Sequence, residues 1–205
     1  MTRTSIEGLF PTPVAFYRWD EGLNDKEIKF IQNLETRPND GNTTSKDSYL
    51  FKRKELRRIK LFAQQCVDDY VGAIYAPITK TNLYTTQAWS NYTKPGQYHH
   101  KHRHQNSIVS GVFYVNANRD DDRIKFFDGK THGQNWKVHT ENWNTYNSES
   151  WWFSVETNML ILFPSTLEHM VETVKGDHER VSLAFNTFWR GEIGNLNELT
   201  HLQLD

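Results

Sequence analysis

Four of the nine histidines of this chain lie in one short segment, residues 98–104 (YHHKHRH). Imidazole is the commonest metal ligand among protein side chains, and a metal ion needs ligands that converge on one point. On a β-strand, residues two apart point to the same face. His100, His102 and His104 would therefore share one face, and His99 would point elsewhere. A neighbouring pair on that face can hold one metal ion, and a third ligand must come from another part of the fold.

His169 is the best remote candidate for that third ligand. It follows an apolar run at 160–163 that ends in a turn at Pro164, and it precedes another expected strand at 169–174. A histidine at the start of a strand, after a tight turn, is well placed to face the mouth of a barrel.

We predict a metal site formed by His102, His104 and His169. Imidazole suits iron, zinc, copper and nickel alike, so these ligands do not by themselves select the metal. An alternative set also remains open, in which His100 and His102 form the pair and His104 lies outside the ligand set.

A second group of residues could bind an anion near that metal. Arg180 opens the run 180–186 (RVSLAFN), eleven residues after His169. Alternation places Val181, Leu183 and Phe185 on one face and Arg180 with Ser182 on the other. A guanidinium binds a carboxylate through two parallel N–H bonds, and a hydroxyl adds a third donor. The pattern predicts a metal pocket with a carboxylate clamp at its back.

The elements that would position these residues fall into two parts. Residues 9–19 are expected to be extended, because Pro11 and Pro13 oppose a helix. Helices are expected at about 24–34, with Asn24 as cap, and at about 53–75, with a polar loop at 36–49 between them. Short β-branched and aromatic runs follow and indicate a β-sandwich or barrel buttressed by the helices: 82–92, 107–116, 123–128, 151–155, 158–163, 169–174 and 180–189.

Bulk composition excludes several classes of protein. The 205 residues are 37% hydrophobic and 14% aromatic, which suits a domain with a buried core. The formal net charge of −1 disfavours a general nucleic-acid binder, and the single Cys66 excludes an intrachain disulfide. No apolar run approaches the roughly 18 residues of a membrane span, and no signal peptide is recognisable, so a cytoplasmic location is expected.

Four segments together resemble a known family, the prokaryotic and phage branch of the 2-oxoglutarate/Fe(II) dioxygenases. They are 102–107 (HRHQNS), 110–115 (SGVFYV), 162–169 (LFPSTLEH) and 179–186 (ERVSLAFN). The resemblance implies a mainly β fold with N-terminal helices and a double-stranded β-helix (jelly-roll, cupin-like) core. It also implies a single domain, residues 1–205, divided into helical support (1–79), core (80–190) and C-terminal tail (191–205).

Carried over by position, His102 and His169 match the two histidine ligands of the family. His104 falls where the wider superfamily has Asp or Glu. The other carried-over positions concern the oxoglutarate C5 carboxylate: Arg180 and Ser182 would grip it, Tyr114 would add a hydroxyl by analogy with prolyl hydroxylases, and Tyr92 would line the same pocket. We expect Arg180 to bind oxoglutarate rather than an acidic residue of the core.

The resemblance implies an oxygenase that uses Fe(II), 2-oxoglutarate and O2, with ascorbate as a supporting reductant. The implied reaction couples oxidative decarboxylation of oxoglutarate to hydroxylation of a small molecule or a protein side chain. The polar insert at 129–150 is expected to be a lid or a plain surface loop. Because His104 replaces a carboxylate, a Zn(II) or cupin-type metalloenzyme and a non-catalytic jelly-roll binding protein stay open. The sequence fixes neither the substrate nor the oligomeric state.

Overall fold

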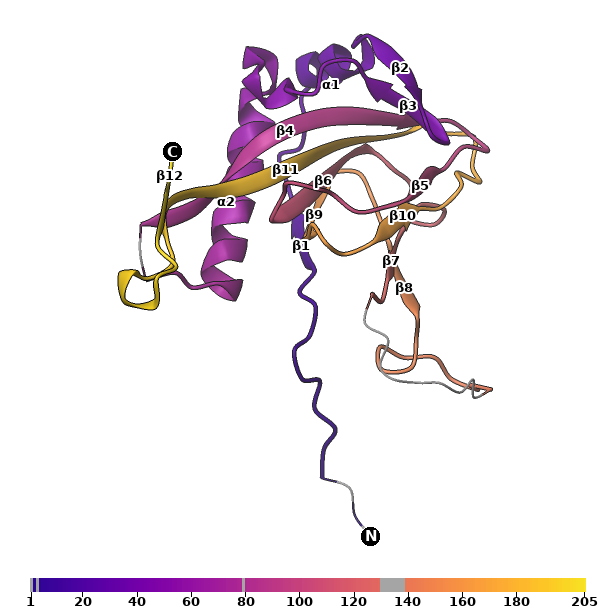
Figure 1. Cartoon of the computed structure of the whole chain (residues 1–205). Helices are drawn as coiled ribbons and strands as arrows, with labels where there is room; N and C mark the ends of the chain where they lie inside the picture. The colour runs from indigo at the N-terminus through magenta and orange to yellow at the C-terminus, as the bar shows by residue number, and fades with distance from the viewer. Residues whose placement is uncertain (1, 3, 79, 130–138) are drawn as a thin grey trace.

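The computed structural model describes residues 2, 4–78, 80–129 and 139–205. Two antiparallel sheets dominate it, with the helices gathered on one side (Figure 1). The large sheet has the order β1 (Ala15–Arg18), β9 (Met159–Pro164), β6 (Val109–Asn116), β11 (Arg180–Ile193), β4 (Thr81–Thr93), β3 (Asn42–Ser45) and β2 (Thr36–Asn39), and β12 (Leu202–Leu204) pairs with β11. The small sheet has the order β5 (His99–His102), β10 (His169–Val171), β7 (Arg123–Phe127) and β8 (Ser150–Ser154). The predicted mainly β fold class is confirmed.

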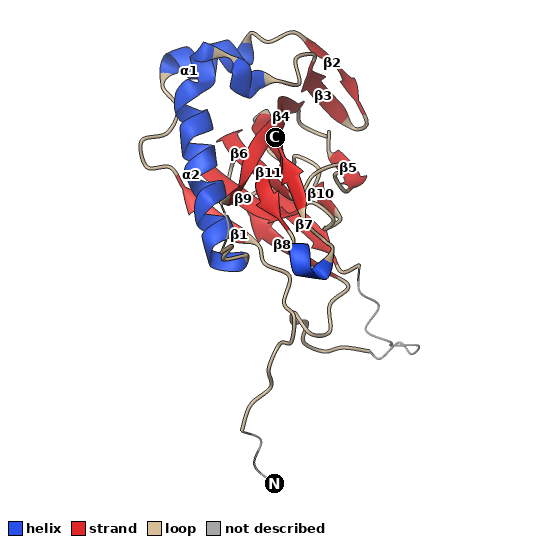
Figure 2. Cartoon of the chain, turned by 60° about the vertical axis from the view of Figure 1, so that its left-hand side comes forward, coloured by secondary structure: helices blue, strands red, loops and turns tan. Residues whose placement is uncertain are grey.

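The two predicted helices are present. α1 (Asp25–Gln32) begins at Asn24, whose side chain accepts from the Glu27 backbone N–H while the Glu27 carboxylate accepts from the Asn24 N–H. α2 (Arg57–Ile74) follows two short 3-10 turns, Leu50–Lys52 and Lys54–Leu56, and a third turn spans Leu196–Glu198. Figure 2 shows α2 lying along one face of the large sheet. Within the described residues, no helix is long and apolar enough to cross a membrane.

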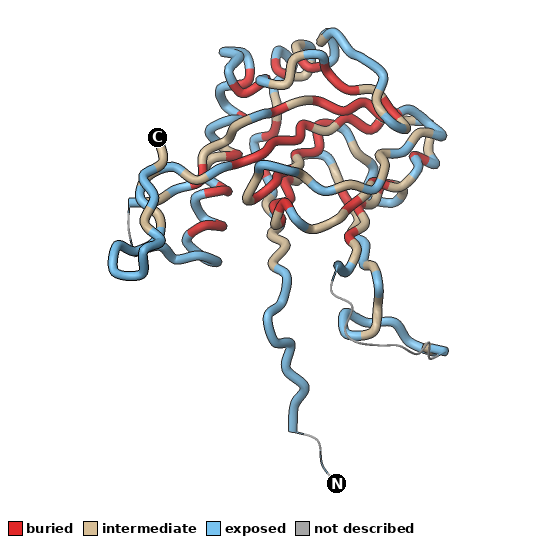
Figure 3. The backbone as a smooth tube through the Cα atoms, in the orientation of Figure 1, coloured by how far each residue is buried: buried red, intermediate tan, exposed pale blue. Residues whose placement is uncertain are grey.

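Each face of the large sheet packs into a different core. Figure 3 shows that buried residues run along its central strands. On the helical face, Val181, Leu183 and Phe185 of β11 join the buried stripe of α2. The predicted apolar face of β11 is therefore confirmed. On the other face, a smaller cluster fills the space between the two sheets: Tyr114, Ile124, Phe126, Val155, Ile161 and Phe163. This inner space is where the opposite face of β11 points.

The polar loop expected at 36–49 is wrong for residues 36–45, which form the β2–β3 hairpin. Asp40 and Gly41 make its turn, and Gly41 has a φ of +85°, a conformation that glycine adopts without strain. Pro38 is tolerated because β2 is an edge strand. The hairpin extends the large sheet beside β4, and β3 pairs with it at Thr43 and Thr44.

Candidate functional site

The three histidines predicted to bind a metal come together in the structure. His102 ends β5, His169 begins β10, and the two residues are paired across these strands. His104 lies in the loop after β5, where its backbone N–H donates to the Ser165 carbonyl at 3.0 Å. One nitrogen of each imidazole lies within 4.8 Å of the other two. The turn after β9 thus fixes both His104 and the start of β10.

Hydrogen bonds select which ring nitrogen is free on two of these histidines. His102 Nδ1 donates to the His100 carbonyl at 2.8 Å, and His169 Nδ1 donates to the Leu167 carbonyl at 3.0 Å. Nε2 of each ring therefore keeps its lone pair, which is the usual arrangement for a metal-bound histidine. His104 Nε2 and His169 Nε2 are 3.4 Å apart. Two nitrogens about 2.1 Å from one ion, at 90–110° to each other, are roughly 3.0–3.4 Å apart, so the pair fits a shared metal.

Burial favours the neutral, ligating form of these imidazoles. It lowers the pKa of His104 to about 4, with a contribution from His102. Burial and the neighbouring rings also hold the pKa of His169 well below its usual value, and burial lowers the pKa of His102. All three rings are neutral at pH 7, as metal ligation requires.

His99 does not point away from the other histidines, so the expectation for it is wrong. Val171 pairs with His99, and His169 pairs with His102. The two pairs are three residues apart on β5 but only two residues apart on β10. The extra residue is a bulge, and it returns His99 to the side that His102 occupies. The His99 ring stacks on His102 with centroids 4.7 Å apart, and burial lowers the pKa of His99 to about 3.

The alternative ligand set also exists as a cluster, since His99, His100 and His102 each bring a nitrogen within 4.8 Å of the others. His100 is the weaker candidate for a ligand. Its Nδ1 lies 3.2 Å from the Asp40 carbonyl, and about a third of its side chain is exposed. Of the two clusters, the one with His104 and His169 has the deeper burial.

Arg180 is buried, with 3% of its side chain exposed, and it contacts an acid of the core. Its Nη1 donates to Asp122 Oδ1 and to the Glu172 carbonyl, both at 3.0 Å. The expectation that Arg180 would not pair with a core acid is therefore wrong. The pairing uses only one end of the guanidinium, because Nη2 is buried with no hydrogen-bond partner.

Tyr114 and Ser182 share the environment of Arg180. Tyr114 pairs with Ser182 across β6 and β11, and its hydroxyl is also buried without a hydrogen-bond partner. Burial raises the pKa of this hydroxyl, and the nearby Arg180 charge partly offsets that effect, so the hydroxyl remains a donor at neutral pH. Two unsatisfied buried donors on one face are costly unless a ligand meets them. A guanidinium N–H and a phenol O–H are both donors of the kind that binds a carboxylate.

Tyr92 lies outside this pocket, and its predicted role there is wrong. It pairs with Val181, so it points to the helical face of the sheet, opposite to Arg180. Its hydroxyl donates to the Ile31 carbonyl at the end of α1. Tyr92 is a core residue that ties β4 to this helix.

Three residues near the site were missed by the sequence argument: Asp122, His99 and Asn91. Asp122 is fully buried beside Arg180, and Asn91, opposite Ser182 on β4, has a buried Oδ1 without a partner. Asp122 stands in an Arg-Asp-Asp-Asp-Arg run that is typical of a solvated turn. No local pattern marks it as buried.

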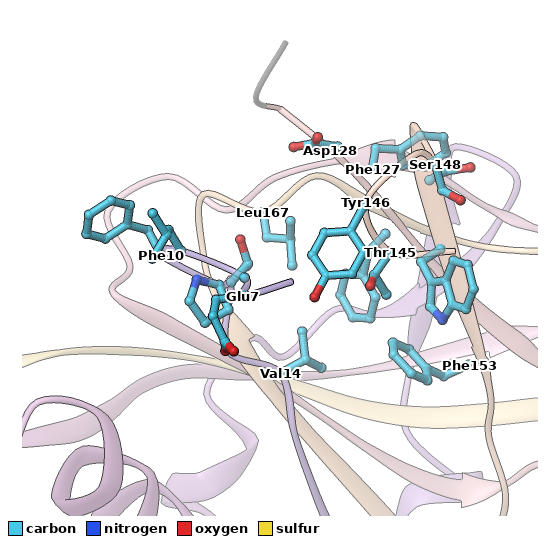
Figure 4. Close-up of a pocket in the computed structure, with 17 residues that line it drawn as sticks. Glu7, Phe10, Val14, Phe127, Asp128, Thr145, Tyr146, Ser148, Phe153 and Leu167 are labelled. Carbon is cyan, nitrogen blue, oxygen red and sulfur yellow. The ribbon is translucent and has the colours of Figure 1, made fainter. Parts of the chain in front are cut away.

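Residues of β7 and β8 line a cavity of about 550 Å³, which Figure 4 shows. None of the clustered histidines is among the residues that line it. Leu167 lines it and also accepts the hydrogen bond from His169 Nδ1. Phe126 lines it too, with its ring centroid 6.2 Å from that of His169. Residues 7–12 of the N-terminal segment and four residues of the insert also line the cavity: Thr145, Tyr146, Ser148 and Ser150. The Tyr146 side chain is directed into it (Figure 4). Residues 130–138 of the insert lie outside the described residues, so the two predictions for it, a lid or a plain surface loop, stay predictions.

Comparison with known families places these residues in context. The model of a family described as "Putative 2OG-Fe(II) oxygenase" matches residues 87–186, a range that contains the histidines, Tyr114, Arg180 and Ser182. This match agrees with the resemblance drawn from the motifs of the same segment. The sequence matches none of the curated proteins.

Solved structures share the fold at low sequence identity. A 2OG-Fe(II) oxygenase family oxidoreductase from Burkholderia pseudomallei is 11% identical, with a TM-score of 0.57 over 85% of this chain and 83% of the other. HygX from Streptomyces hygroscopicus, solved with nickel, 2-oxoglutarate and hygromycin B, is 12% identical, with a TM-score of 0.55 over 86% and 82%. A prolyl-4-hydroxylase from Pseudomonas putida is 12% identical, with a TM-score of 0.54 over 85% and 92%. The double-stranded β-helix core is thereby confirmed.

Proposed function

We propose that this protein is an Fe(II) dioxygenase that couples oxidative decarboxylation of 2-oxoglutarate to hydroxylation of a second substrate. One observation carries the proposal. The same inner space holds three neutral imidazoles, two of which have Nε2 left free by their hydrogen bonds, and a buried guanidinium with one unsatisfied end. His99 links the two groups, because its ring stacks on His102 and its pKa is lowered in part by the Arg180 charge.

Each residue then has a distinct role. His102, His104 and His169 hold Fe(II), while Arg180 Nη2, the Tyr114 hydroxyl and Ser182 hold the C5 carboxylate of oxoglutarate. Bound there, Fe(II) would supply the oxidising chemistry by which oxoglutarate, O2 and a substrate C–H give succinate, CO2 and an alcohol, and ascorbate would keep the metal reduced. The protein supplies orientation and a dry environment. The Phe163 ring, 4.6 Å from that of His169, and the Phe126 ring keep water from that side of the ligand set.

The cavity of Figure 4 is the proposed entry for the hydroxylated substrate. Its volume of about 550 Å³ lies within the usual range for small-molecule pockets. Its walls carry several aromatic rings, among them Phe127, Tyr146, Trp151 and Phe153. A small molecule or one side chain of a protein substrate fits such a space.

A zinc enzyme is the second candidate. The three histidines, taken by themselves, are more typical of a zinc site than of an oxygenase. Three imidazoles are the ligands of known zinc hydratases, and the usual oxygenase triad has a carboxylate where His104 stands. A zinc hydrolase would leave the unsatisfied donors of Arg180 and Tyr114 without a purpose. We therefore place the oxygenase first.

The test is the formation of succinate and CO2 from oxoglutarate. The protein is incubated with Fe(II), ascorbate and C1-labelled oxoglutarate, and the same reaction is run with Zn(II). We expect turnover with Fe(II) and none with Zn(II). His169→Ala should lose the activity. His201→Ala should keep it, because His201 is partly exposed, pairs with Glu192 and lies far from the cluster. Equal product in the His169→Ala sample, or hydrolytic activity only with Zn(II), would contradict the assignment.

A further inference from the structure

Asp122 is the most completely buried charged group beside the carboxylate clamp, with no exposed side-chain area. Its Oδ2 accepts from the Asn118 backbone N–H at 2.8 Å and from His178 Nε2 at 2.6 Å. Its Oδ1 accepts from Arg180 Nη1 at 3.0 Å. Each carboxylate oxygen therefore has a fixed partner, and the turn before β7 holds the group in place.

The contacts of Arg180 are divided unevenly between its two ends. The two protons of Nη1 are used by Asp122 and by the Glu172 carbonyl, while Nη2 is buried and makes no hydrogen bond. A guanidinium is planar, so fixing Nη1 in two directions also fixes where Nη2 points. Nη2 is the atom that the proposed function assigns to oxoglutarate.

We propose that Asp122, braced by His178, is a positioning residue that aims Arg180 at the distal carboxylate of oxoglutarate. The inference rests on the proposed function. Asp122 touches neither oxoglutarate nor the metal in this account, and it acts by holding the guanidinium plane. Residues that hold a metal ligand in place typically change affinity by roughly 10–100-fold when they are replaced, and we expect an effect of similar size where Asp122 holds Arg180.

A second explanation for Asp122, compensation of the Arg180 charge, predicts the opposite change in oxoglutarate affinity. If Asp122 served only to neutralise the buried guanidinium, its removal would free a full positive charge and tighten carboxylate binding. If Asp122 positions Arg180, its removal allows the guanidinium to reorient and weakens binding. The direction of the change in affinity therefore separates positioning from charge compensation.

The experiment measures binding of two ligands to the Mn(II)-loaded protein by calorimetry. Oxoglutarate is compared with 2-oxopentanoate, which keeps the metal-chelating end but lacks the distal carboxylate. In Asp122→Asn, an isosteric change that keeps an acceptor oxygen, we expect oxoglutarate to bind about tenfold more weakly and 2-oxopentanoate to bind as in the wild type. Asp122→Ala should weaken oxoglutarate further. Circular dichroism checks the fold, and Asp122→Asn stands alone if the alanine variant does not fold.

Asp121→Asn is the matched control, because this neighbouring acid accepts from the Asn118 side-chain amide and does not contact Arg180. It should bind both ligands normally. Unchanged or tighter oxoglutarate binding in Asp122→Asn would overturn the positioning role while leaving the proposed function intact. Equal weakening for both ligands would also overturn it, because that pattern marks a general structural defect. Absence of oxoglutarate binding in the wild-type protein would overturn the proposed function itself.

Discussion

The proposed metal end of the site (His102, His104 and His169) and its proposed carboxylate end (Arg180, Tyr114 and Ser182) are oriented in the same way but carry different charges. At the metal end, backbone carbonyls hold Nδ1 of His102 and His169 and leave Nε2 free. At the carboxylate end, Asp122 and the Glu172 carbonyl hold Nη1 of Arg180 and leave Nη2 free. In both places the protein uses one half of a ligand group to aim the other half.

The difference lies in how each end tolerates being buried without a ligand. The histidines are neutral because burial lowers their pKa, so they need no counter-charge. Arg180, in contrast, carries a charge and is buried against the Asp122 carboxylate, 3.0 Å away. The metal end should consequently respond to pH, and the carboxylate end to changes in hydrogen-bond geometry.

The largest expected effect is loss of the metal. His169→Ala removes the one ligand that comes from β10, so metal affinity should fall by at least about a hundredfold. Titration calorimetry with Mn(II) measures it, and circular dichroism should show an unchanged fold. His201→Ala is the control and should bind as the wild type does. Undiminished affinity in His169→Ala would remove His169 from the ligand set and favour the cluster of His99, His100 and His102.

A smaller effect, on oxoglutarate binding, is expected from substitutions of Arg180. Arg180→Gln should weaken oxoglutarate binding by roughly 10–100-fold, since hydrogen bonds to charged groups contribute about 1.5–3 kcal/mol each. Mn(II) affinity should stay the same, because Arg180 is not a ligand. Arg180→Lys should recover binding only in part, since an ammonium cannot satisfy Asp122 and a second carboxylate with the same fork. Arg190→Gln, on the exposed end of the same strand, is the control, and a parallel loss of Mn(II) binding in Arg180→Gln would show that the two ends are not separable.

Position 104 tests the departure from the usual triad. His104→Asp restores a carboxylate and should keep Mn(II) affinity within about tenfold of the wild type, whereas His104→Ala should lose more. The two titrations are run side by side on folded protein. If neither substitution changes the Mn(II) affinity, His104 is not a ligand, and the cluster of His99, His100 and His102 must hold the metal.

The response to pH is the mildest effect and separates the two ends. An exposed histidine in the unfolded chain has a pKa near 6.5, while that of His104 in the folded protein is about 4. Below about pH 6.5, His104 binds a proton in the unfolded chain but not in the folded protein. The free energy of unfolding therefore decreases as the pH falls. The metal-free protein should keep its full stability above pH 6.5 and lose it progressively toward pH 4. Melting temperatures at pH 7.5 and 5.5 measure this, and a shallower dependence is expected in His104→Gln; a flat profile in the wild type would contradict the pKa assignment.

The metal end could be predicted from the sequence because its signals are local. His102 and His104 are two residues apart, and His169 follows a Pro turn between two apolar strands. The position of His99 could not be predicted in this way. It depends on a bulge, and a bulge is defined by the partner strand rather than by the segment itself. The Asp40-Gly41 turn, in contrast, was a readable hairpin signal within the segment expected to be a loop.

The carboxylate end was only half predictable. Alternation along β11 correctly separated Arg180 and Ser182 from the apolar face. The prediction for Tyr92 was wrong because pairing with Val181 decides which face of the sheet Tyr92 occupies. The sequence of β4 alone does not encode that register. Asp122 was missed because a run of acids in a turn is normally solvated, and its burial arises only when that turn folds onto Arg180.

The most direct test of the whole account is the affinity for oxoglutarate with and without metal. If one ligand spans both ends, oxoglutarate must chelate the metal held by His102, His104 and His169 while its far carboxylate contacts Arg180. Calorimetric titration of oxoglutarate should then give binding at least about a hundredfold tighter in the Mn(II)-loaded protein than in the metal-free protein, and His169→Ala should abolish this gain. Equal affinity in both forms, or no binding in either, would contradict a single site built from the two ends.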